Sequence, residues 1–143
     1  MKQNGEIRIG FYVCHCGVNI SSIIDLKSVV EYATTLPGVV LARDYKYMCS
    51  EPGQALIEED IKEHHLNRIV VASCSPLLHE QTFRKAAERG GLNPYFCHIV
   101  NIREHNSWVH EERSAATRKA KDMIRAAMYR IVFHKALEKK RVP

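Results

Sequence analysis

The sequence lacks the long apolar stretches that membrane-spanning and secreted proteins carry. No run among its 143 residues approaches the roughly 18–20 consecutive apolar residues that a membrane span needs. The first ten residues, MKQNGEIRIG, contain no apolar segment of the kind found in secretory signals. We therefore expect no membrane span, and a cytoplasmic location.

Two common cofactor motifs are also missing. There is no CxxC pair, which argues against a ribbon-type zinc site and against a thioredoxin-like dithiol. No GxGxxG follows a predicted strand, so this chain is not expected to bind FAD through the dinucleotide fingerprint. Internal repeats and low-complexity segments are absent as well.

The composition is that of a globular domain, and it includes five cysteines, which is many for the expected cytoplasmic location. Hydrophobic residues make up 45% and charged residues 26% of the chain, which is typical of soluble proteins. The length suits one domain with a substantial core. Cytoplasmic thiols are kept reduced, so the five cysteines favour metal or redox chemistry over structural disulfides.

Short apolar runs alternate with helical patterns along the chain. The runs at 7–14, 39–49, 68–74 and 95–102 predict strands, and Asp25, Ser50 and Ser75 are placed to cap helices between them. This alternation predicts an α/β fold, a flavodoxin- or Rossmann-like open parallel sheet of about four strands with helices on both faces. We expect the first strand to lie between the second and third. Apolar residues at helical spacing predict a long C-terminal helix over 114–138.

Positive charge is concentrated at the C-terminal end. Residues 113–143 hold ten lysines and arginines but two acidic residues, a net charge of +8, which leaves −3 on residues 1–112. We therefore predict an α/β domain over 1–112 and a basic helical segment over 113–143, which packs on the domain or docks on a partner. A solvated helix face is the alternative. No nucleic-acid partner is expected, because no aromatic platform accompanies the charge.

The cysteines follow predicted strands. Cys14 and Cys16 come after the first strand, Cys49 after the second and Cys74 after the third. Since the carboxyl ends of parallel strands share one edge of a sheet, these thiols are expected to converge. Four thiolates are the ligands of an iron–sulfur cluster, and less often of zinc, so we predict a [4Fe–4S] site. Cys97 lies inside the fourth strand and is expected to pack in the core.

Serines and histidines near these strand ends are weaker candidates for the site. Ser50 and Ser75 would place helix N-termini beside the thiols, where free N–H groups stabilise negative charge. His79, His105 and His110 follow strands three and four and are candidates to line the site. No spacing pairs a cysteine with a histidine base. For any single cysteine, burial as a small apolar side chain is the alternative.

Five stretches together resemble the N-terminal iron–sulfur domain of the A-type subunit of heterodisulfide reductase, over roughly residues 8–110. They are FYVCHCGVNI, LPGVVLARDYKYMCSEPGQ, LNRIVVASCSPLLHEQTFR, GLNPY and NIREHNSWVH. Members of that family are iron–sulfur flavoproteins of anaerobes. They act in complexes that couple hydrogen or formate oxidation, by flavin-based bifurcation, to reduction of ferredoxin and a disulfide.

The resemblance implies one [4Fe–4S] cluster on this chain and FAD on an adjoining domain or partner. The implied partners are a flavin-binding heterodisulfide reductase domain of the A type and other iron–sulfur subunits. The family pattern has a cysteine in the segment that reads EHNSW at 104–108 here, where this chain has Asn106. The ligand set is then completed by both Cys14 and Cys16, or by His105.

These observations predict an electron-transfer module or subunit of a heterodisulfide reductase-like oxidoreductase complex. No catalytic residue and no bond-making chemistry are expected from this chain alone. The alternative is a redox-sensing or regulatory binding module that uses free thiols or zinc.

Overall fold

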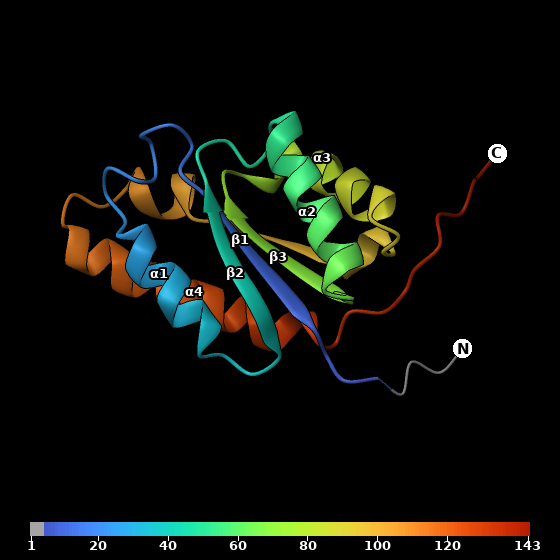
Figure 1. Cartoon of the computed structure of the whole chain (residues 1–143). Coiled ribbons are helices and arrows are strands. Elements are labelled where there is room, and N and C mark those ends of the chain that lie inside the picture. Colours follow the sequence, from blue (N-terminus) through green and yellow to red (C-terminus); the bar gives the residue numbers. More distant parts are fainter. Residues whose placement is uncertain (1–4) are drawn as a thin grey trace.

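The computed structural model describes residues 5–143, and its centre is a parallel sheet of four strands (Figure 1). The strands are β1 (Ile9–Cys14), β2 (Val39–Tyr45), β3 (Arg68–Ser73) and β4 (Cys97–Asn101). Their order is β2-β1-β3-β4, and every pair is parallel. This confirms the open parallel sheet and the place of the first strand between the second and third.

Helices cover both faces of the sheet, as the alternation predicted (Figure 1). On one face lie α1 (Leu26–Thr34) and α4 (Arg113–Ile131), and on the other lie α2 (Glu51–Glu63) and α3 (Pro76–Arg89). Side chains of β1 alternate between two cores: Phe11 packs with α1 and α4, whereas Tyr12 packs with α2 and α3. Within residues 5–143, no helix is both long and apolar enough to cross a bilayer.

Capping side chains set the starts of three helices. Asp25, Ser50 and Ser75 are the N-caps of α1, α2 and α3, and each side chain accepts a backbone N–H from the first helical turn. Such a bond satisfies a donor that the helix itself leaves unpaired. As a result, α2 begins at Glu51, two residues after Cys49, and α3 begins at Pro76, two residues after Cys74.

The predicted second and fourth strands and the predicted last helix were too long. Strand β2 ends at Tyr45, and residues 46–49 form a turn. Residues 94–96 form a turn of 3₁₀-helix, so β4 begins at Cys97. Helix α4 ends at Ile131 rather than near residue 138, and the buried side chain of Arg68 binds carbonyls at and just beyond this end. The Nε of Arg68 donates to the carbonyl of Ile131 at 3.1 Å, and its Nη2 donates to the carbonyl of His134 at 3.4 Å.

Helix α4 belongs to the core of the domain rather than standing apart from it. Its buried face includes Ala120, Ile124 and Ile131, which pack in one cluster with α1 and the sheet. The opposite face is basic: Arg118, Arg125 and Arg130 are exposed. The segment therefore packs on the α/β unit with one face and presents positive charge with the other.

A buried carboxylate ties α2 to the first two strands. Asp60 is 2% exposed and accepts hydrogen bonds from the Tyr12 hydroxyl at 3.1 Å and from two nitrogens of Arg43 at 2.7 and 2.9 Å. Burial, reinforced by the negative charge of Asp60, raises the pKa of Tyr12, so its hydroxyl keeps its proton.

Removing this carboxylate should destabilise the fold. Asp60→Ala leaves the Tyr12 hydroxyl buried without an acceptor, so we expect a loss of about 2 kcal/mol in the free energy of unfolding, measured in urea. Glu58→Ala is the matched control, since it removes a more exposed ion pair with Arg89. It should cost less than about 1 kcal/mol. Equal, small losses in both variants would contradict this role of Asp60.

Candidate metal centre at the carboxyl edge of the sheet

The structure places four of the five cysteines at the same edge of the sheet. Cys14 is the last residue of β1, and Cys16 lies in the turn that follows. Cys49 and Cys74 directly precede the N-caps of α2 and α3. Cys97 is the first residue of β4, so it lies at the opposite edge, buried in the core as expected.

The thiols at this edge lie close enough to influence one another. Burial is the largest cause of the raised pKa values of Cys14, Cys49 and Cys74, the last reaching about 11. Negative charge at Cys16 adds to the increase at each of the three. These thiols therefore hold their protons near neutral pH, and a metal that binds them as thiolates must displace those protons.

The spacing of the sulfurs separates two kinds of metal site. Within residues 5–143, no three cysteine sulfurs all lie within 4.8 Å of one another. A zinc ion with tetrahedral thiolate ligands would draw its sulfurs to about 3.8 Å apart, given a Zn–S bond of about 2.3 Å. A cubane cluster binds each cysteine at a different iron, which keeps the sulfurs farther apart. The sulfurs of the described residues are not gathered as closely as a zinc ion would hold them, and four thiols are a ligand set that a cluster accepts.

One group of potential ligands elsewhere does bring its donor atoms within 4.8 Å of one another. It consists of Asp60, Glu63 and His64, at the end of α2. The carboxylate of Asp60, however, is already engaged by the guanidinium of Arg43 and by the hydroxyl of Tyr12. Because a cation already neutralises this carboxylate, the group is explained as an ion pair within the fold.

The turn after β1 directs backbone N–H groups at a cysteine sulfur. Cys16 and Gly17 both have left-handed backbones, with φ of 52° and 63°. In this turn the N–H of Cys16 donates to the sulfur of Cys14 at 3.2 Å, and the N–H of Met48 donates to the same sulfur at 3.3 Å. The φ of Gly17 lies in the left-handed region, which glycine adopts without the strain that a Cβ brings. Such N–H donors stabilise negative charge on sulfur.

The segment that departs from the family pattern lies in a π-helical turn, Arg103–Ser107, after β4. Asn106 is fully buried, and its Nδ2 donates to the carbonyl of Ala116 at 3.0 Å. Its side chain therefore faces α4 rather than the thiols. His105 is exposed, and Lys119 donates to its carbonyl at 2.6 Å.

The other histidines near this edge make contacts of their own. The Nδ1 of His79 lies 3.2 Å from the Thr82 hydroxyl within α3, and the Nδ1 of His110 lies 2.9 Å from the carbonyl of Asn106. His15, between Cys14 and Cys16 in sequence, reaches across to β2, where its Nε2 lies 2.5 Å from a carboxylate oxygen of Asp44. This contact ties the turn to the neighbouring strand.

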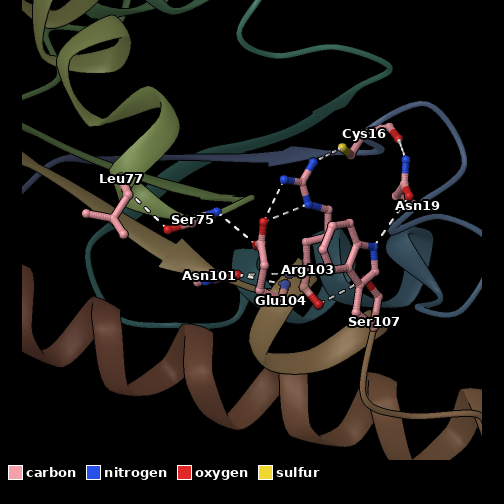
Figure 2. A network of polar contacts seen from close by, with 9 residues as sticks. Cys16, Asn19, Ser75, Leu77, Asn101, Arg103, Glu104 and Ser107 are labelled. Atoms are coloured by element: carbon pink, nitrogen blue, oxygen red, sulfur yellow. Dashed lines mark hydrogen bonds and ion pairs between the residues drawn. The ribbon is translucent and has the colours of Figure 1, made fainter.

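Sequence reasoning missed two charged residues that contact the thiol edge. The Nη1 of Arg103 donates to the sulfur of Cys16 at 2.9 Å, and its Nη2 donates to Glu104 at 2.6 Å (Figure 2). Glu104 in turn accepts the N–H of Ser75 at 3.0 Å. The network joins the segments that follow β1, β3 and β4. The sequence could have indicated both residues, because Arg103 and Glu104 come shortly after the fourth strand, just as the cysteines come after the first three.

Large apolar side chains are exposed in the same segments. Leu77, at the start of α3, is 96% exposed, and Trp108 is 57% exposed. The exposed apolar residues that follow strands at this edge are Val18, Tyr47, Leu77, Leu78, Trp108 and Val109. We call this group the apolar rim. Exposed apolar surface bordered by polar groups is typical of interaction sites.

The fold and the thiols define a class of protein: a doubly wound α/β domain that carries cysteines at the carboxyl edge of its sheet. No family model matches the sequence. Among curated proteins, the chain is 57% identical over 134 residues to the second iron–sulfur A subunit of the CoB–CoM heterodisulfide reductase of Methanopyrus kandleri. That match covers 93% of this chain and 20% of the relative.

Two further relatives have corresponding names. The chain is 53% identical over 138 residues to the A subunit of the H(2):CoB-CoM heterodisulfide,ferredoxin reductase of Methanothermobacter marburgensis, covering 96% of this chain and 21% of the relative. It is 52% identical over 124 residues to a protein of Archaeoglobus profundus named as like the heterodisulfide reductase A subunit, covering 86% of this chain and 18% of the relative. The chain belongs to the family of heterodisulfide reductase A subunits, and it spans about a fifth of the length of these curated relatives.

Proposed function

We propose that this chain is an electron-transfer module that carries one [4Fe–4S] cluster on Cys14, Cys16, Cys49 and Cys74. One observation carries the proposal: four thiols, the ligand set of a cubane cluster, lie at one sheet edge after three strands. The names of the relatives, which describe iron–sulfur subunits, support it.

The residues around the thiols supply backbone N–H groups and helix N-termini, which stabilise the negative charge of a cluster. A bound cluster would accept and donate single electrons. Backbone N–H groups of Cys16 and Met48 point at the sulfur of Cys14, and the N-termini of α2 and α3 begin beside Cys49 and Cys74. We assign no catalytic residue, and the chain acts as a component of an oxidoreductase complex of the heterodisulfide reductase type.

The proposed partners lie outside this chain. They are a flavin-binding A-type domain or subunit, which holds the FAD, and other iron–sulfur subunits of a flavin-based electron-bifurcating complex in the cytoplasm of an anaerobe. The apolar rim supports docking at the thiol edge, since its exposed residues lie in segments that follow the strands at that edge. The basic outer face of α4 offers a second contact region within residues 113–143.

Anaerobic purification with iron and sulfide analysis tests the proposal. We expect about four irons and four sulfides per chain, with broad visible absorption from sulfur-to-iron charge transfer. A stoichiometric zinc ion without visible absorption would favour the alternative instead, a redox-sensing or regulatory module that uses zinc or free thiols.

The identity of the fourth ligand can be tested by substitution. Cys14→Ala and Cys16→Ala should both impair the cluster, whereas His105→Ala should leave it assembled, because the side chain of His105 is exposed, while Cys14 ends β1 and Cys16 lies in the turn after it. Pulsed EPR on the reduced protein provides the measurement. A strongly coupled imidazole nitrogen that is lost in His105→Ala would show instead that His105 is the ligand and that Cys14 or Cys16 is free.

A further inference from the structure

We propose that Arg103 is a positioning residue of the metal centre, which raises the reduction potential of the cluster by donating a hydrogen bond from Nη1 to the sulfur of Cys16. The inference rests on the proposed function, because it concerns the cluster that the four cysteines would hold. It assigns a role to a residue that is neither a ligand nor part of the apolar rim.

The contact itself is short and largely protected from solvent. The Nη1 of Arg103 lies 2.9 Å from the sulfur of Cys16, and the side chain of Arg103 is only 14% exposed. A partly buried charge is screened less than one in bulk water, so it acts strongly on nearby sulfur. A hydrogen bond from a guanidinium to a thiolate is also of the charge-assisted kind.

A carboxylate fixes the direction of the guanidinium (Figure 2). Glu104 accepts from the Nη2 and Nε of Arg103 at 2.6 and 3.0 Å, which leaves Nη1 facing Cys16. Glu104 is itself held by the N–H of Ser75 at 3.0 Å. The side chain of Asn101 accepts the N–H groups of both Arg103 and Glu104, at 3.3 and 3.0 Å.

A second chain of contacts returns from Arg103 to the same cysteine. The guanidinium carbon lies 4.7 Å from the centre of the Trp108 ring. The indole N–H of Trp108 donates to Asn19 at 3.4 Å, and the side chain of Asn19 donates to the carbonyl of Cys16 at 3.1 Å. Two sets of contacts therefore hold Arg103 against the turn that contains Cys16: the direct bond to its sulfur, and the path through Trp108 and Asn19. Hydrogen bonds of this kind fix the orientation of groups around a metal site.

The charge of Arg103 lies directly against one proposed ligand, the sulfur of Cys16. Reduction adds negative charge to a cluster, so a fixed cation and an N–H donor to sulfur favour the reduced state. Removing them should therefore make the cluster harder to reduce.

The test is a redox titration of the anaerobically prepared protein, followed by EPR or visible absorption. We expect Arg103→Met to weaken one-electron reduction at least tenfold, which corresponds to a potential about 59 mV more negative. Arg103→Gln removes the charge but keeps N–H donors, and Arg103→Lys keeps the charge but loses the fork, so both should shift less. Arg89→Met is the matched control: it removes an arginine that binds Glu58 and Gln54 on the outer surface, and it should leave the potential unchanged.

Each outcome decides between the hypotheses. A cluster that assembles in the Arg103 variants with the potential of the unmodified protein would overturn the inference but leave the proposed function intact. Loss of the cluster in all three Arg103 variants would overturn it too, because Arg103 would then be needed for assembly rather than for the potential. Absence of iron and sulfide from the unmodified protein would overturn the proposed function itself.

Discussion

Cys49→Ala and Cys74→Ala should each reduce the iron content of the anaerobically prepared protein from about four atoms per chain to less than about one. Each residue is the one thiol that follows its strand, so no neighbouring cysteine can replace it. Three remaining thiols would leave one iron of the cubane without its protein ligand. Iron and sulfide analysis of the two variants, together with their visible absorption, measures the loss.

Cys97→Ala is the control for that experiment. Cys97 is buried at the opposite edge of the sheet, and burial raises its pKa to about 12, so it remains an uncharged packing residue. Its removal should leave the iron content unchanged and cost about 1 kcal/mol of stability. Iron loss in Cys97→Ala, with retention in Cys74→Ala, would reverse the ligand assignment.

Removal of the cluster should lower the melting temperature by about 10 °C. The cluster would join the segments that follow β1, β2 and β3, and a group that binds only the folded chain stabilises it. For a gain of about 4 kcal/mol, a domain of this length shifts by about 2–4 °C per kcal/mol. Calorimetry of the holoprotein and of protein stripped by chelator under oxidation gives the difference.

The variant Cys74→Ala supplies the comparison for this second experiment. It lacks one ligand, so the same stripping treatment should leave its melting temperature unchanged. Equal melting temperatures for the holoprotein and the stripped protein would show that the cysteine segments gain no stability from a bound group.

The strands, the helix starts and the common edge of the thiols were predictable from local patterns combined with the rules of parallel sheets. Buried strands appear as short apolar runs, and Asp25, Ser50 and Ser75 cap helices through bonds to their own first turns. Once the strands are parallel, the place of a cysteine at a strand end follows from topology alone. This is why Cys49 and Cys74 could be assigned to the same edge from sequence.

The features that sequence reasoning missed depend on contacts between distant segments. At the end of α4, the carbonyl of Ile131 accepts a hydrogen bond from Arg68 on β3, and the helical pattern of the last segment does not indicate that contact. Arg103 reaches a cysteine 87 residues earlier in the chain. The direction of Asn106 toward α4 likewise depends on how the turn after β4 packs. Such side-chain positions are set by tertiary structure rather than by local pattern.

Native mass spectrometry of the anaerobically purified protein tests most directly whether the four thiols hold a [4Fe–4S] cluster. Four irons and four sulfides add about 350 Da to the mass of the chain, and the proposal predicts one such adduct, which is lost in Cys74→Ala but kept in Cys97→Ala. An adduct of about 65 Da, the mass of one zinc ion, or an unmodified chain with five free thiols, would contradict it.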